Sequence, residues 1–152
     1  MVQKFDPITL EILWRRIISI VDEADASVAR TAFSSLLRDA HDYTCTFTDR
    51  KGRLLAQGTF CTPGQAGAMM LGIKKWVNML PLEEYKPGDI FITNDPWLLA
   101  GHLNDVCVMS PIFYKDKVAG FTACVFHHSD IGGRVASDNH DVYEDGLFIP
   151  PV

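Results

Sequence analysis

The feature that most constrains the fold is a pair of apolar runs joined by a three-residue polar turn. The runs span residues 106–114 and 118–126, and residues 115–117 form the turn between them. A turn this short makes two extended runs pair side by side as an antiparallel β-hairpin. The residues just before the first run and just after the second therefore meet at one end of the hairpin. Pro111 predicts a bulge, or an edge position, in the first strand.

Both flanks of this hairpin carry histidine and aspartate. His102 and Asp105 precede the first strand, and His127, His128 and Asp130 end or follow the second. Imidazole and carboxylate ligands suit a divalent ion such as Zn, Mn, Fe or Ni. Neither flank contains a thiol, which argues against a closed structural zinc site. The pattern predicts an open metal centre, with a plain His–Asp hydrogen bond in a loop as the alternative explanation.

The two neighbouring histidines cannot act as a pair. Consecutive side chains of a strand point to opposite faces of the sheet, so His127 and His128 cannot both face one point while the strand continues. Either His128 acts with Asp130, two residues away, or the strand ends and His127 reaches the site. The residue types leave both arrangements open.

A second polar turn lies near the same end of the predicted sheet. Asn94 and Asp95 follow a short apolar strand at residues 90–93 and precede Pro96. They are candidates for binding substrate or for orienting a metal ligand through a hydrogen bond. The alternative is an Asx turn, in which these side chains satisfy only the local backbone.

The N-terminal part of the chain predicts one long amphipathic helix. Apolar residues recur every three or four positions from residue 7 to residue 37, with Asp6 as the cap and Pro7 at the first helical position. Ser34 and Ser35 mark a possible break. Such a helix would be about 45 Å long. A helix of this length is expected to pack against another domain or subunit.

The remaining segments predict an α+β fold. Strands are expected at residues 43–48 and 53–58, a loop at 59–67, and a second helix at 68–80. The strand at 118–126 is almost entirely apolar, so both of its faces are expected to be covered. We therefore expect a long N-terminal amphipathic helix, followed by β-hairpins in a mixed, largely antiparallel sheet with a second helix.

Composition narrows the classes of partner. The chain has 152 residues, within the range of one domain, and a net charge of −5 without a basic run, which argues against nucleic acid. No stretch approaches the roughly 18 uncharged apolar residues of a membrane span, and no signal peptide is recognised, so a cytoplasmic location is expected.

The four cysteines lack metal-type spacing and are predicted to be reduced and mostly buried, with Cys107 and Cys124 as neighbours on the hairpin.

Seven motifs, in order along nearly the whole chain, resemble those of the hydantoinase B/oxoprolinase family. They are Asp6-Pro7-Ile8-Thr9-Leu10-Glu11, Ala40-His41-Asp42-Tyr43-Thr44-Cys45, Gly52-Arg53-Leu54-Leu55-Ala56-Gln57-Gly58, Thr93-Asn94-Asp95-Pro96-Trp97, His102-Leu103-Asn104-Asp105-Val106, His127-His128-Ser129-Asp130-Ile131-Gly132-Gly133 and Glu144-Asp145-Gly146-Leu147-Phe148-Ile149-Pro150-Pro151.

The resemblance implies a subunit of an ATP-dependent enzyme that acts on amide or ketone carbonyls. Members of the family include 5-oxoprolinases, N-methylhydantoinases, related lactamases, and acetone and acetophenone carboxylases. A hydantoinase A-type partner carries ATP and activates the substrate, and the B-type subunit completes hydrolysis or carboxylation. Family proteins are several hundred residues long, so residues 1–152 are expected to be the N-terminal part of a single hydantoinase B-like domain that continues beyond this chain.

The resemblance also bears on individual residues. In the family the first residue of the pair is regularly histidine, whereas an aromatic residue can replace the second, which favours His127 as a ligand over His128. The implied metal ligands are His102, Asp105, His127 and Asp130, with Asp105 and His127 as catalytic residues. The residues implied to bind substrate or support the ligands are Asn94, Asp95 and His128.

Two positions depart from the family pattern. Leu99-Ala100-Gly101-His102 stands where Gly-Gly-Thr-His is usual, and a histidine common in the second loop is replaced near Gln65. These changes bear on the substrate pocket. We expect a subunit of an ATP-dependent hydrolase of cyclic amides that uses a divalent ion (Zn, Mn or Fe). A ketone carboxylase subunit and a non-catalytic scaffold that docks the partner are the alternatives.

Overall fold

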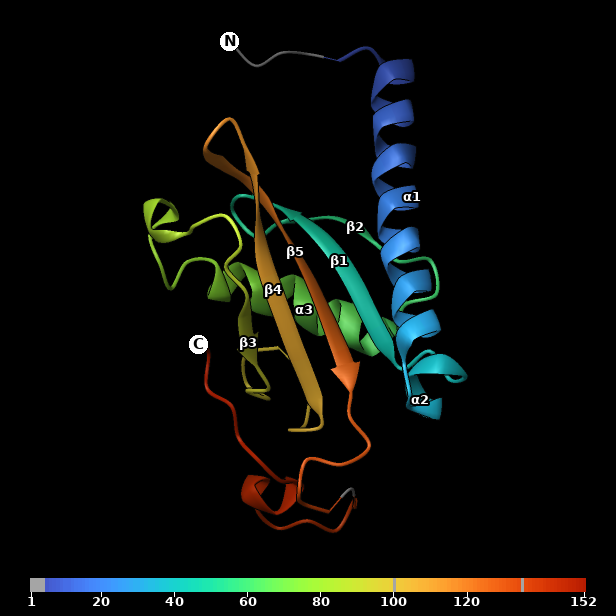
Figure 1. The fold of residues 1–152 in the computed structure, drawn as a ribbon, viewed down its shortest axis with the longest axis vertical. Helices are drawn as coiled ribbons and strands as arrows, with labels where there is room; N and C mark the ends of the chain where they lie inside the picture. Colours follow the sequence, from blue (N-terminus) through green and yellow to red (C-terminus); the bar gives the residue numbers. More distant parts are fainter. Residues whose placement is uncertain (1–4, 100, 135) are drawn as a thin grey trace.

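A five-stranded sheet, antiparallel at every pairing, forms the centre of the computed structural model, which describes residues 5–99, 101–134 and 136–152 (Figure 1). The strand order is β2-β1-β5-β4-β3. The strands are β1 (Tyr43–Asp49), β2 (Leu54–Gln57), β3 (Phe91–Thr93), β4 (Asp105–Tyr114) and β5 (Lys117–His127). The helices are α1 (Pro7–Thr31), α2 (Ser35–Arg38) and α3 (Pro63–Trp76), with short 3₁₀ turns at Leu82–Glu84 and Val142–Asp145. The predicted α+β class is confirmed.

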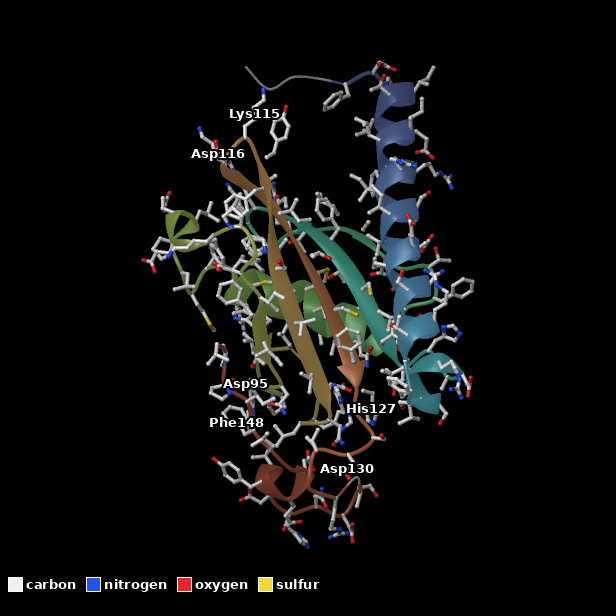
Figure 2. All side chains as sticks on the ribbon, in the orientation of Figure 1. Asp95, Lys115, Asp116, His127, Asp130 and Phe148 are labelled. Atoms are coloured by element: carbon white, nitrogen blue, oxygen red, sulfur yellow. The ribbon has the colours of Figure 1, made fainter. Side chains whose placement is uncertain are left out.

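The β4–β5 hairpin is the predicted one, with a tighter turn. Tyr114 pairs with Lys117, and Lys115 and Asp116 between them have φ values of 48° and 61°. Two consecutive positive φ angles are typical of a type I′ turn, whose twist matches that of the strands. Figure 2 labels both turn residues at the end of the hairpin far from His127.

A bulge interrupts the hairpin close to Pro111, as predicted. Phe113 pairs with Val118, but Ile112 pairs with Gly120, so Ala119 has no partner on β4. From there the pairing is regular to the far end, where Asp105 lies opposite His127. The two flanks of the hairpin therefore meet in space.

Both faces of the sheet are covered, as expected for β5. On one face α3 packs against β4 and β5 around a core that includes Ile73, Trp76, Phe121 and Val125. On the other face Val21 of α1 belongs to a second core, together with side chains of β1, β2 and β5. Figure 1 shows α3 crossing one face of the sheet and α1 running along its β1–β2 side.

The first predicted helix is shorter than expected and breaks where the serines indicated. α1 ends at Thr31, and Ala32 has an extended backbone. The chain turns helical again at Ser35, because the Ser34 hydroxyl accepts the backbone N–H of Leu36 as a cap. Large apolar side chains between residues 8 and 20 of α1 are exposed, namely Ile8, Leu10, Ile12, Leu13, Trp14 and Ile20. The expected packing against another domain or subunit stays a prediction.

The start of the second helix was predicted wrongly. α3 begins at Pro63 with Thr62 as its cap residue, and it ends at Trp76. Pro63 and Gly64 suggested a loop over residues 59–67, but Pro63 occupies the first helical position, where proline is a start signal. Among the described residues, no helix combines the length and the apolar character needed to cross a bilayer.

Cys107 and Cys124 lie on adjacent strands, as predicted, but their side chains are not neighbours because they project to opposite faces of the sheet. Cys107 pairs with Val125 and lies on the α3 face, whereas Cys124 lies on the α1 face. Cys124 is opposite Cys45 of β1, and their sulfurs are 3.0 Å apart. All four cysteines are free thiols, and three of them are buried.

Two glycines of α3 test how closely this helix packs. A Cβ at Gly72 would lie 2.1 Å from the Leu98 carbonyl oxygen, whereas a Cβ at Gly67 would meet no atom within 4 Å. We expect Gly72→Ala to lower the free energy of unfolding by about 1–3 kcal/mol through overpacking. Gly67→Ala should raise it by about 0.5–1 kcal/mol through helix propensity. Urea unfolding of both variants measures the difference, and equal effects would contradict the packing of Leu98 on α3.

Candidate metal centre

The end of the hairpin opposite its turn places a histidine and an aspartate side by side. Asp105 is the first residue of β4 and His127 the last of β5, and the two are paired across the strands. Residues opposite each other in an antiparallel pair project to the same face. The Nδ1 of His127 lies 3.0 Å from Asp105 Oδ1, and both residues are buried.

His102 joins this pair from the preceding loop. Its Nε2 lies 3.1 Å from the same Asp105 Oδ1, and its carbonyl accepts the backbone N–H of Asp105 at 3.3 Å. The rings of His102 and His127 have centroids 4.8 Å apart. One candidate ligand atom from each of the three residues lies within 4.8 Å of the others.

This group is a candidate site for a divalent metal ion. Two ligand atoms bonded to one such ion at about 2.0–2.2 Å are about 2.8–3.6 Å apart for angles between the octahedral and tetrahedral values. The two distances to Asp105 Oδ1, 3.0 and 3.1 Å, fall in that range. Two imidazoles and a carboxylate also match the open ligand sets of catalytic metal sites.

A fourth polar residue, Asp42, was not predicted from the sequence. It directly precedes β1, its backbone carbonyl accepts the His127 N–H, and its Oδ2 lies 3.7 Å from His127 Nδ1. Gln65 donates to Asp42 Oδ1 at 3.1 Å and accepts the Thr44 hydroxyl at 3.1 Å. A side chain of α3 therefore orients the Asp42 carboxylate.

These residues face a pocket of about 430 Å³. Its walls come from the start of β1, the first turn of α3, the loop before β4 and the end of β5. The lining residues are Asp42, Thr62, Gly64, Gln65, Ala68, Gly101, His102, Asp105 and His127. Gln65 thus lies in the pocket at the position where the sequence departs from the family pattern. Ala100, in the other departing segment, lies outside the described residues.

Two of the predicted site residues point away from this group. His128 is exposed, and its backbone N–H donates to the Asn104 carbonyl. Asp130 is exposed, and its Oδ1 accepts the Gly132 N–H at 2.8 Å in a local turn. Figure 2 labels Asp130 in the loop beyond His127. The structure brings together three of the four predicted ligands and does not bring in Asp130.

Asn94 and Asp95 make backbone contacts. Asn94 is buried, donates to the carbonyls of Leu103 and Leu147, and accepts the Ile149 N–H. It ties three segments together, and both of its amide N–H groups are used in doing so. Asp95 accepts the Trp97 N–H at 2.9 Å, which is the Asx turn considered as the alternative.

The Asp105 carboxylate alters the acidity of His102. The hydrogen bond from His102 to Asp105 raises the pKa of the His102 imidazole above its ordinary value of 6.5, against the opposing effect of burial. The charges of Asp105, Asp145 and Asp42 act in the same direction. A metal ion bound here would therefore compete with a proton for His102.

A model of the Hydantoinase B/oxoprolinase family matches residues 6–152. An uncharacterized protein of Methanocaldococcus jannaschii is 35% identical over 96% of this chain and 27% of its own length. A protein of Pseudomonas sp., named as the putative B-type subunit of a D-/L-hydantoinase, is 31% identical over 95% of this chain and 26% of its own length. The crystal structure of ATP-dependent caprolactamase from Pseudomonas jessenii superposes with a TM-score of 0.80 at 30% identity, over 99% of this chain and 26% of that one. The chain thus spans about a quarter of the length of these relatives.

The raised pKa of His102 is testable in the metal-free protein. We expect NMR titration to give His102 a pKa above 6.5, and Asp105→Asn to lower it by removing the charged partner. Because the pKa of His102 is higher in the folded state than in the unfolded state, protonated His102 stabilises the fold through its bond to Asp105. This stabilisation is fully present below the unfolded-state pKa and is lost as the pH rises through the folded-state pKa.

Asp130→Asn is the control for this titration, because Asp130 is outside the group and should leave the His102 value unchanged. A His102 pKa at or below 6.5 in the metal-free protein would contradict the hydrogen bond to Asp105.

Proposed function

Because this chain belongs to the hydantoinase B/oxoprolinase family, we propose that it is part of a subunit of an ATP-dependent hydrolase of cyclic amides. The observation that carries the proposal is the group of half-buried His102 with buried Asp105 and His127 at the wall of a pocket. The names of the relatives, a hydantoinase component and a caprolactamase, favour hydantoin- or lactam-type substrates, and the name of the family adds the 5-oxoproline type.

The ligand set proposed for a divalent ion (Zn, Mn or Fe) is His102, Asp105 and His127, with Asp42 as the fourth candidate. Such an ion polarises a carbonyl and lowers the pKa of bound water. Asp105 fixes both imidazoles through one carboxylate oxygen. Gln65 holds Asp42 at the pocket wall by its hydrogen bond. The sequence favoured Asp130 as the fourth ligand, and that assignment stays a prediction.

The ATP chemistry is proposed to belong to a partner of hydantoinase A type. The sequence has no glycine-rich phosphate loop ending in Lys-Ser or Lys-Thr. The relative from Pseudomonas sp. carries the designation B within its hydantoinase, which supports a second component, and the caprolactamase is named as ATP-dependent. Since the relatives are about four times longer, residues 1–152 are proposed to be the N-terminal part of one hydantoinase B-like domain.

Metal analysis separates the two candidate fourth ligands. We expect the purified full-length protein to hold one divalent ion, and Asp42→Ala, Asp105→Ala and His127→Ala each to weaken binding by at least about tenfold. Asp130→Ala should bind like the wild type because its carboxylate serves a local turn. Affinity should fall on acidification as protons compete for His102.

The opposite outcome, metal loss in Asp130→Ala with retention in Asp42→Ala, would restore the ligand set expected from the sequence. A wild-type protein without stoichiometric metal, together with full activity of Asp105→Ala and His127→Ala, would remove the metal hypothesis altogether.

The reaction class is tested with the ATP-binding partner present. We expect ATP turnover with hydantoin or a lactam to open the ring without consuming bicarbonate, and Asp105→Ala to slow it by at least about 100-fold. Bicarbonate consumption with a ketone substrate would establish the carboxylase alternative. An unchanged rate in Asp105→Ala would point to a scaffold role for this segment.

A further inference from the structure

Two buried cysteines face each other across β1 and β5, which run side by side in the sheet (Figure 1). Cys45 pairs with Cys124 in the antiparallel register, and the Cys45 thiol donates to Cys124 Sγ at 3.0 Å. Directly opposed residues of an antiparallel pair have Cα atoms about 4.5–5.5 Å apart. A disulfide spans Cα separations of about 4.4–6.8 Å. The two sulfurs can therefore be joined without separating the strands.

The other two cysteines make different contacts. Cys107 lies on the opposite face of the sheet, and its thiol contacts the Val108 carbonyl at 3.7 Å. Cys61 is half-buried in a loop, and its sulfur accepts the side-chain amide of Gln57 at 3.2 Å. Among the residues that the structure describes, no hydrogen bond joins either of them to another thiol. They therefore serve as internal controls for the Cys45–Cys124 pair.

A cavity between α1 and the sheet leads to one of the paired thiols. It has a volume of about 280 Å³, and Cys45, which is 5% exposed, belongs to its lining. The walls include Ile17 and Val21 of α1 and Phe47 and Thr122 of the sheet. Hydrogen peroxide is small and uncharged and fits such an apolar cavity, whereas a charged tripeptide disulfide does not. Oxidation of the pair by a peroxide would therefore begin at Cys45.

The surroundings keep the pair protonated, which makes it slow to react. The hydrogen bond with Cys124, followed by burial, raises the pKa of the Cys45 thiol, and the nearby Asp25 carboxylate acts in the same direction. The thiolate is the nucleophilic form of cysteine, so only a small fraction of the molecules reacts at any moment. Disulfide formation takes seconds to hours depending on the oxidant, and the slow end of that range is expected here.

We propose that Cys45 and Cys124 form a reversible disulfide that ties β1 to β5 when a peroxide oxidises the pair. The peroxide transfers one oxygen to Cys45, giving a sulfenic acid and one water. The Cys124 sulfur then attacks the Cys45 sulfur, its thiol proton leaves with the hydroxyl as a second water, and the S–S bond forms. A dithiol reductant reverses the change and is itself oxidised to a disulfide.

The bond would lie beside the candidate metal centre. Cys45 is three residues from Asp42, and Cys124 is three residues from His127. Oxidation would therefore fix the two strands that carry these side chains. The inference does not depend on the proposed function, because it rests on the pairing of β1 with β5 and on the two thiols.

Peptide mapping of the full-length protein tests the proposal. The protein is held in hydrogen peroxide for several hours, the peroxide is removed, and the remaining thiols are blocked with N-ethylmaleimide in denaturant before digestion. We expect a pair of peptides joined through Cys45 and Cys124, which dithiothreitol separates. Cys45→Ser and Cys124→Ser should each lack this linkage. Cys61→Ser is the matched control and should retain it.

Thermal unfolding gives a second readout. The disulfide would join residues 79 positions apart, and closing such a loop restricts the unfolded chain. We expect the Tm of the oxidised wild type to exceed that of the reduced protein by at least about 3 °C. Cys45→Ser should show no such rise.

A wild type without the Cys45–Cys124 linkage after peroxide treatment would overturn the proposal, even if the serine variants do not fold. Linkage of either residue to a different cysteine would overturn it as well. If the linkage forms but the Tm does not rise, the bond strains the strands, and its role as a tie between β1 and β5 is lost.

Discussion

One carboxylate oxygen holds the candidate centre together. Asp105 Oδ1 lies 3.0 Å from His127 and 3.1 Å from His102, so a single atom accepts hydrogen bonds from two imidazoles that reach it from different segments. A carboxylate is only an acceptor, which requires both ring nitrogens to carry protons when no metal is bound. Once those protons leave, the same three atoms would offer two nitrogens and one oxygen to a divalent ion. Burial of Asp105 keeps the arrangement out of solvent and strengthens it.

Two asparagines beside the centre illustrate different uses of one side chain. Asn94 uses its amide on the carbonyls of Leu103 and Leu147 and on the Ile149 N–H, and so it fixes the loop before β4 to the C-terminal segment. Asn104 uses its Nδ2 on the His128 carbonyl and leaves a buried oxygen unmatched among the described residues. The first arrangement is typical of a structural tie, whereas the second leaves one buried acceptor unsatisfied.

Local sequence patterns predicted what depends on neighbouring residues. The short turn at residues 115–117 led to the hairpin and to the meeting of His102, Asp105 and His127, and the serines marked the break after α1. Contacts between distant segments were not predictable in this way. Asp42 reaches His127 because β1 pairs with β5, and Cys124 faces Cys45 for the same reason. The register of that pairing is set by the packing of both sheet faces, which no local pattern reports.

The bulge near Pro111 has a consequence at the opposite end of the hairpin. Ala119 is the unmatched residue between Val118, which faces Phe113, and Gly120, which faces Ile112. Had the pairing at the turn continued unchanged, Asp105 would face Phe126, and His127 would project from the other side of the sheet. The centre therefore depends on the number of residues near the turn, although that turn lies at the other end of the hairpin. In the history of such a gene, the gain or loss of one codon near the turn would create or erase the site while leaving every ligand residue in place.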